Sequence, residues 1–180
     1  MTGTHSASTS GDARILSEST EHFRYIVLAL QRQGGRRLNR LFATLGLTAS
    51  QAEAIEVIGT FGPMTTRQAG EYLVCESGSP SRLLAALADK GLTVRSNPPE
   101  DRRATLHALS RTGRDMLAKV INSQQAFNEQ MGSAIADVER DFADDRVRQL
   151  AELVVDPDLR HALTMRFPAL YGLQQPDAEA

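Results

Sequence analysis

Residues 65–113 of this 180-residue chain read TTRQAGEYLVCESGSPSRLLAALADKGLTVRSNPPEDRRATLHALSRTG. The first part of this stretch predicts a short helix over Thr66–Leu73. Ala69, Tyr72 and Leu73 recur there at the three- and four-residue spacing of one helical face. A hydroxyl side chain at Thr65 or Thr66 can cap this helix, because it accepts a hydrogen bond from an unpaired first-turn amide.

A second helix is expected from near Ser77 to Lys90. Pro80 is tolerated in its first turn, where backbone amides have no partner within the helix. An apolar stripe of this helix faces inward and consists of Leu83, Leu84 and Leu87. The outer side carries Ser79, Ser81, Arg82, Ala85 and Asp89. Small hydroxyl residues beside an arginine suit an element that enters the major groove of DNA.

Two extended segments follow, Thr93–Asn97 and Ala104–Leu109, separated by a proline-rich break. They predict a β-hairpin whose tip carries Asp101, Arg102 and Arg103, where the carboxylate can brace a guanidinium group. An arginine on a narrow ribbon fits the minor groove, although a charged tip of this kind is also consistent with a solvated turn. Together, the two predicted helices and the predicted hairpin indicate a winged helix-turn-helix. The fold class expected is mainly α-helical with a small β-hairpin wing.

Several short segments, in order and without a gap over residues 47–113, resemble the MarR family of bacterial transcription regulators. They are Leu47-Thr48 with Gln51, Ala69–Leu73, Ser81–Leu83, Asp89–Leu92, Pro99–Arg103 and Leu109-Ser110 with Thr112-Gly113. The resemblance implies a homodimer that binds double-stranded DNA at a palindromic operator, usually as a repressor. Such a repressor is released by oxidation or by a small apolar or aromatic ligand, bound between the DNA-binding part and the dimerisation helices.

By position, the resemblance places the recognition helix at Ser77–Asp89 and the wing signature at Asp101 and Arg103. Ala85 and Ala86 stand where the family often has charged residues, which shifts the expected phosphate contacts to arginines elsewhere. The resulting candidate DNA-binding residues are Arg67, Ser77, Ser79, Ser81, Arg82, Arg95, Asp101, Arg102 and Arg103.

The net charge of −2, from 20 basic and 22 acidic residues, argues at first against a polyanionic partner. However, the charges are segregated along the chain. Basic residues dominate the candidate DNA-binding part, at Arg67, Arg82, Lys90, Arg95, Arg102, Arg103, Arg111 and Arg114. Acidic residues gather later, at Asp137, Glu139, Asp141, Asp144 and Asp145. The local sign of the charge decides where DNA docks.

Cys75 is the single cysteine, which excludes an intrachain disulfide and is typical of a reducing compartment. It lies in the turn before the recognition helix, where an activated thiolate would act as a redox switch. The alternative is a small apolar turn residue. The resemblance favours this alternative, because the family's peroxide-sensing cysteines lie near the first helix.

The flanking regions predict long helices on both sides of residues 47–113. Apolar spacing predicts one helix over Ser17–Leu45, interrupted by Gly34-Gly35, where either a bend or a close backbone is expected. Thr48 with Gln51, or Ser50 with Glu53, forms a capping box for a helix that ends near Phe61. The expected layout is a disordered segment 1–16, a single domain 17–173 and a mobile tail 174–180. Within the domain, segments 17–46 and 114–155 hold the dimerisation helices, and 156–173 is a helical extension.

After the wing, Ser110 or Thr112 caps a further long helix with an extended apolar seam. The seam consists of Leu117, Val120, Ile121, Phe127, Met131, Ile135, Val138 and Phe142. Its length favours a partner helix in a two-fold dimer, although packing within one subunit also fits the pattern. A later helix is expected over Ala143–Val155, with Val147, Leu150, Leu153 and Val154 facing inward.

The remaining patterns exclude other classes of function. The histidines at 5, 22, 107 and 161 are scattered, so no metal site is expected. No phosphate-binding loop or nucleophile motif is present, so neither an enzyme nor a cofactor is indicated. Neither a membrane span nor a signal peptide is evident, which places the protein in the cytoplasm. The rival hypothesis is a winged-helix protein-interaction module that has lost DNA binding, suggested by Ala85, Ala86 and the acidic balance.

Overall fold

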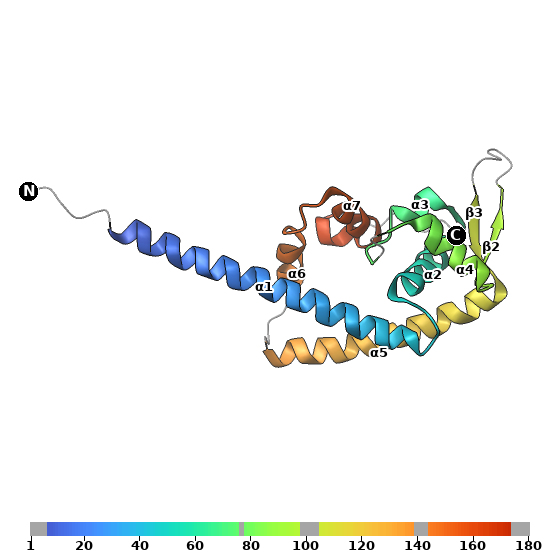
Figure 1. Ribbon diagram of the computed structural model, residues 1–180, viewed down its shortest axis with the longest axis horizontal. Coiled ribbons are helices and arrows are strands. Elements are labelled where there is room, and N and C mark those ends of the chain that lie inside the picture. The colour runs from blue at the N-terminus through green and yellow to red at the C-terminus, as the bar shows by residue number, and fades with distance from the viewer. Residues whose placement is uncertain (1–6, 76–77, 98–104, 139–143, 174–180) are drawn as a thin grey trace, which may run out of the picture. The chain divides into compact units, whose positions relative to one another are not determined.

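The computed structural model describes residues 7–75, 78–97, 105–138 and 144–173 (Figure 1). The chain divides into two compact units, Met1–Leu41 and Phe42–Ala180. The first unit consists of most of helix α1 (Ala7–Ala43). The second unit contains every other helix and strand, so the candidate functional site is built within it.

Helix α1 begins at Ala7 and not near Ser17. Residues 7–16 are therefore helical and do not belong to the disordered segment that their composition predicted. Once the long helix is nucleated, each added residue forms one more backbone hydrogen bond, so residues of modest propensity are included at low cost. The helix continues through Gly34 and Gly35, and nothing in the described chain lies within 4 Å of a Cβ built at either glycine.

Helix α2 (Ala49–Phe61) starts at the capping box predicted from Thr48 and Gln51. The Gln51 amide donates to Thr48 Oγ1 at 3.2 Å, and the Thr48 amide donates to Gln51 Oε1 at 3.3 Å. Lys90 Nζ donates to Gln51 Oε1 at 2.9 Å and to the Gly46 carbonyl oxygen at 2.6 Å. Hydrogen bonds therefore connect the start of α2 to Lys90, which lies far along the chain.

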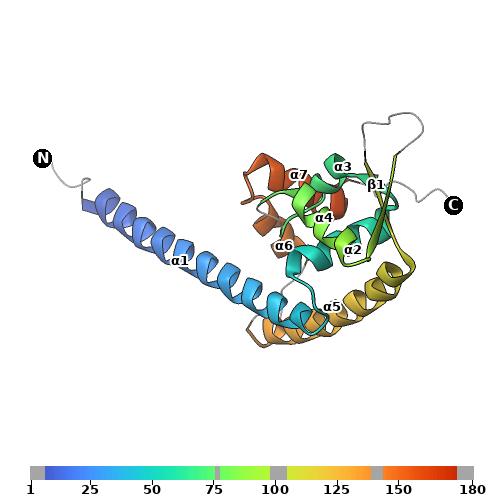
Figure 2. The same ribbon diagram turned by 45° about the vertical axis from the view of Figure 1, so that its right-hand side comes forward.

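A three-stranded antiparallel sheet and two helices follow α2 (Figure 2). In chain order the elements are β1 (Met64–Thr65), α3 (Thr66–Gly70), α4 (Pro80–Asp89), β2 (Thr93–Ser96) and β3 (Leu106–Leu109). The sheet order is β1-β3-β2, with Met64 opposite His107 and Arg95 opposite His107 on the other side. The sequence predicted the β2–β3 hairpin but missed β1, because two residues are too few to show an alternating pattern.

The hydrophobic core of the second unit forms around α2, which packs against α4, α5 (Arg111–Val138) and β3. Its most deeply buried side chains, each at most 1% exposed, are Ala52, Ala54, Ile55, Val57, Ala69, Leu84, Leu87 and Val120. The helix-turn-helix therefore shares one continuous core with the helices before and after it.

The C-terminal part contains α6 (Asp144–Ala151), α7 (Pro157–Arg166) and the 3₁₀ helix η1 (Pro168–Tyr171). Asp156 caps α7, since its carboxylate accepts the amides of Asp158 and Leu159. The prediction that Leu150 and Leu153 face inward was wrong, because they are 49% and 58% exposed. Helix α6 ends at Ala151, so the helical stripe does not reach Leu153, while Leu150 lies on an exposed side of α6. Within the described ranges, no helix combines the length and apolar character needed to cross a bilayer.

Candidate nucleic-acid interface

Helix α4, which corresponds to the predicted recognition helix, begins at Pro80, with Ser79 as its cap. The sequence had placed this start near Ser77. The residue before a proline resists the helical conformation, and the Arg82 amide reaches back to Ser79 Oγ at 3.5 Å. Leu83, Leu84 and Leu87 are buried as predicted. Ser81, Arg82 and Asp89 are exposed, so a hydroxyl and a guanidinium group lie on the open face near the helix N-terminus.

Helix α3 begins at its own capping box and approaches α4 closely at Gly70. The Gln68 amide donates to Thr65 Oγ1 at 3.3 Å, and Gln68 Oε1 accepts the Thr65 amide at 2.9 Å. A Cβ built at Gly70 would lie 3.3 Å from Pro80 Cγ, so the two helices approach closely at this glycine.

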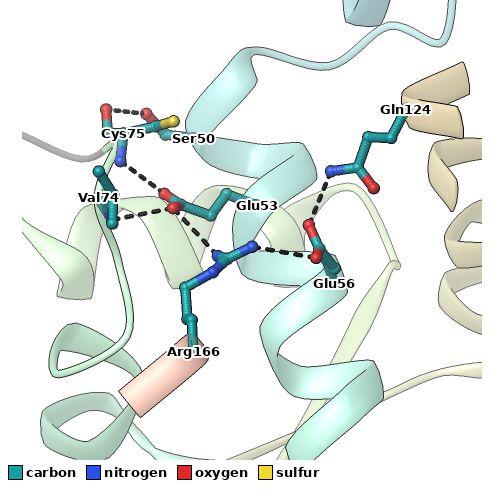
Figure 3. Close-up of polar contacts among 7 residues, drawn as sticks. All are labelled: Ser50, Glu53, Glu56, Val74, Cys75, Gln124 and Arg166. Atoms are coloured by element: carbon teal, nitrogen blue, oxygen red, sulfur yellow. Dashed lines mark hydrogen bonds and ion pairs between the residues drawn. The ribbon is translucent and has the colours of Figure 1, made fainter. Parts of the chain in front are cut away.

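Glu53 of α2 holds the chain at Val74 and Cys75. Its two carboxylate oxygens each accept a hydrogen bond from one of these two successive backbone amides. The Val74 amide donates to Oε1 at 2.9 Å, and the Cys75 amide donates to Oε2 at 2.8 Å (Figure 3). Ser50 Oγ also donates to the Cys75 carbonyl oxygen at 2.9 Å. Three hydrogen bonds from one face of α2 therefore position the chain just before the recognition helix.

Arg166, at the end of α7, joins the same group of side chains. Its guanidinium donates to Glu53 at 3.1 Å and to Glu56 at 3.0 Å, while Gln124 of α5 donates to Glu56 at 2.7 Å (Figure 3). The side chains of Arg166 and Glu53 are only 12% and 8% exposed. Burial raises the pKa of Glu53, and the amides of Val74 and Cys75, together with Arg166, oppose that rise. The C-terminal part is thus connected through Glu53 to the turn before α4.

His107, on the central strand β3, is 3% exposed. Its Nε2 lies 3.0 Å from Thr66 Oγ1, which connects the strand to the first residue of α3. Nδ1 is buried and has no hydrogen-bond partner in the described part of the chain. Burial and the neighbouring Arg95 lower the pKa of His107, so the imidazole stays neutral near pH 7.

Four of the predicted DNA-binding residues lie on the exposed surface of the helix-turn-helix and its hairpin: Arg67, Ser81, Arg82 and Arg95. Ser79 is half-buried at the cap of α4. The exposed side chain of Arg67 lies 3.6 Å from Glu71, a weak pair that leaves its guanidinium accessible. The remaining candidates, Ser77, Asp101, Arg102 and Arg103, lie outside the described residues.

Two of the basic residues counted in the candidate DNA-binding part also make hydrogen bonds within the fold. Lys90 donates to the start of α2, and Arg114 Nη1 donates to the Leu109 carbonyl oxygen at 3.0 Å. The sequence pattern did not indicate that Glu53 binds the Val74 and Cys75 amides or that Arg166 pairs with Glu53. Glu53 had been noted only as part of a capping pattern, and nothing local pairs it with a residue 113 positions later.

Cys75 is an exposed residue. Its surroundings nevertheless disfavour the ionised form of its thiol. Partial burial of the thiol and the neighbouring Glu53 carboxylate raise the pKa of Cys75 to about 11. An activated cysteine requires the opposite shift. The environment of Cys75 therefore favours a packing role over the redox switch considered from the sequence.

Alkylation of Cys75 by iodoacetamide is expected to be slow at pH 8 and to accelerate up to about pH 11. The thiolate fraction at pH 8 is roughly two-hundredfold lower than in a free cysteine of pKa ~8.5. The measurement is the pH profile of the second-order rate constant, with free cysteine as the control. A midpoint at or below pH 8 would restore the redox hypothesis.

Comparisons with known proteins agree with this geometry. Residues 47–113 match the winged helix DNA-binding domain family. No curated protein matches the chain significantly. A probable transcriptional regulator from Pseudomonas aeruginosa is 27% identical, with 70% of this chain and 94% of that chain covered and a TM-score of 0.57. A MarR-like transcription regulator from Bacillus cereus is 14% identical, with coverages of 76% and 99% and a TM-score of 0.69. Reduced AbfR bound to DNA is 16% identical, with coverages of 71% and 93% and a TM-score of 0.57.

Proposed function

We propose that this chain, which carries a winged helix DNA-binding domain over residues 47–113 within a MarR-like fold, is a homodimeric transcriptional repressor relieved by a small molecule. The observation that carries the proposal is the open face of α4, where Ser81 and Arg82 are exposed on a helix anchored by three buried leucines. Such a face presents donors to base edges while its opposite side stays fixed in the core.

In the proposed complex each α4 enters a major groove and each wing reaches the adjacent minor groove. Ser77, Ser79, Ser81 and Arg82 contact bases or phosphates near the start of the helix, and Arg67 and Arg95 contact the phosphate backbone. Asp101 braces one of the two wing arginines, Arg102 or Arg103. A two-fold dimer then requires a palindromic operator with half-sites about one helical turn apart, ~34 Å. A repressor of this kind acts in the cytoplasm, where the DNA lies.

Dimerisation is supported by apolar side chains that remain exposed in the single chain. On α1 these are Phe23, Tyr25, Ile26, Val27, Leu28 and Leu30, each between 46% and 60% exposed. On α5 they include Ile121 and Met131, at 46% and 42%. Contiguous apolar surface of this kind is typical of an interface. Light scattering is expected to give twice the chain mass of 19.6 kDa, and a monomer at micromolar concentration would contradict the dimer.

Replacing Arg82 with Ala is expected to weaken binding to a specific operator by about 1–3 kcal/mol, because a base-reading guanidinium is lost. The measurement is a gel shift with DNA from upstream of the protein's own gene, at two salt concentrations. Arg146→Ala, an exposed arginine on α6, is the matched control and should leave the affinity unchanged.

Arg103→Ala tests the wing separately from the recognition helix. Loss of a phosphate contact should weaken binding to all sequences and reduce the salt slope by about 1. An unchanged affinity and slope would remove the wing from the proposal. If the wild-type chain bound no DNA at either salt concentration, the protein-interaction module would be the better assignment.

A further inference from the structure

Two glutamates on one side of α2, Glu53 and Glu56, share the guanidinium group of Arg166 (Figure 3). Arg166 Nη1 lies 3.1 Å from Glu53 Oε1, and its Nη2 lies 3.0 Å from Glu56 Oε1. Of these two glutamates, Glu53 alone accepts backbone amides from the described residues, those of Val74 and Cys75. The pair therefore has a common cation but unequal contact with the chain before α4.

We propose that Glu53 is a positioning residue for DNA binding and that Arg166 makes helix α7 part of the DNA-binding unit. This inference rests on the proposed function. The side chain of Glu53 is 8% exposed, so it acts through the backbone that it holds, between the end of α3 at Gly70 and the Ser79 cap of α4. A segment that is already ordered loses less conformational entropy when DNA binds, so these hydrogen bonds raise the affinity.

The charge of Glu53 makes this role distinguishable from simple electrostatics. A carboxylate repels the phosphates of DNA, so charge alone predicts that its removal strengthens binding. Burial raises the pKa of Glu53, and the Val74 and Cys75 amides, together with Arg166, oppose the rise. An ionised carboxylate has both oxygens available to accept these amides, whereas a protonated carboxyl carries a hydrogen on one of them. Arg166 thus favours the form of Glu53 that holds the chain.

Glu53→Gln tests the positioning role, with Glu56→Gln as the matched control. Glutamine keeps one acceptor oxygen and turns an NH₂ group toward the second amide, so one hydrogen bond to the backbone is lost. Glu53→Gln should weaken binding to DNA from upstream of the protein's own gene roughly fivefold, with an unchanged salt slope. Glu56→Gln removes the same charge and should leave the affinity unchanged or slightly tighter. Equal losses from the two substitutions would overturn the proposal.

Hydrogen exchange separates positioning from a general loss of stability. In Glu53→Gln, the Val74 and Cys75 amides should exchange faster than in the unmodified chain, while amides of the core helices keep their protection. Ser50→Ala is a second variant, used if Glu53→Gln folds poorly. It removes the hydrogen bond to the Cys75 carbonyl oxygen without changing any charge, and it should weaken DNA binding roughly twofold. Unchanged exchange at Val74 and Cys75 in Glu53→Gln would overturn the positioning role.

The contribution of α7 is tested by Arg166→Gln against Arg160→Gln, which removes the same charge from the same helix. Arg160 pairs with Glu152, and the two side chains are 39% and 60% exposed. Arg166→Gln, or Arg166→Lys if that variant folds poorly, should weaken DNA binding several-fold and accelerate exchange at the Val74 amide. Arg160→Gln should do neither, and equal effects would overturn the role of α7.

The failure of this inference is distinguishable from that of the proposed function. If the unmodified chain bound no DNA, the proposed function would fail and the role of Glu53 in DNA affinity would fail with it. If the unmodified chain bound DNA and Glu53→Gln bound it as tightly as Glu56→Gln, the inference alone would fail.

Discussion

Replacing Arg166 with Ala is expected to lower the free energy of unfolding by about 3 kcal/mol, because removing one partner of a buried ion pair leaves the other charge uncompensated. The substitution leaves Glu53, whose side chain is 8% exposed, and Glu56, at 27%, without their shared cation. Glu53 must then remain ionised beside another carboxylate in a partly dry environment. Urea denaturation at pH 7.5 measures the loss.

The same substitution should make stability depend more strongly on pH. Burial already raises the pKa of Glu53, and Arg166 opposes that rise. Without Arg166 the folded-state pKa rises further above the unfolded value, so the folded state binds more protons across that interval. Stability is then lost as pH rises from about 4.5 through the folded pKa, and the deficit of Arg166→Ala should be smaller at pH 4.5 than at pH 7.5.

Arg67→Ala provides the matched control for this ion pair. Arg67 lies 3.6 Å from Glu71, and their side chains are 91% and 39% exposed, so their attraction is weak and screened. Its removal should change stability little at either pH. Equal losses in the two variants, or a deficit of Arg166→Ala that does not vary with pH, would contradict the role assigned to the buried cluster.

The second large effect is expected from Gly113→Ala, at the start of α5. A Cβ built at this glycine would overlap the Leu92 carbonyl oxygen, a backbone atom just before β2. The overlap cannot be relieved by a rotamer change, so α5 must move away from the chain that enters the sheet. We expect a loss of about 3 kcal/mol or more, the upper range for overpacking.

Gly132→Ala, on the same helix, separates this overlap from a general effect of glycine replacement. Nothing in the described chain lies within 4 Å of a Cβ built at Gly132. Alanine should therefore be neutral or should stabilise the helix by up to about 1 kcal/mol. Thermal unfolding of both variants checks the prediction, and equal shifts in Tm would refute the close approach at Gly113.

The predictions from sequence that succeeded depend on neighbours in the chain. The capping box of Thr48 and Gln51, the buried face of Leu83, Leu84 and Leu87, and the β2–β3 hairpin all involve residues at most a few positions apart. Such patterns follow from backbone geometry and helical spacing, which one sequence displays directly. They were sufficient to predict the helix-turn-helix and the exposed side of α4.

The features that the sequence did not reveal depend on residues far apart in the chain. Arg166 and Glu53 are 113 positions apart, and Lys90 reaches Gly46 across 44 positions. No periodicity connects such pairs, so the sequence indicated neither contact. The strand β1 pairs with β3 through Met64 and Thr65 alone, and that partnership is decided by tertiary packing.

The order of the sheet also constrains how the protein emerges during synthesis. The central strand β3 is the last of the three to leave the ribosome, and both β1 and β2 depend on it for their backbone partners. A nascent chain that ends at Ser96 therefore exposes two unpaired strand edges on either side of a finished helix pair. Leu109 must leave the ribosome before these edges close, so a pause in translation after Ser96 has emerged and before Leu109 has emerged would prolong a stage with exposed strand edges that favours aggregation.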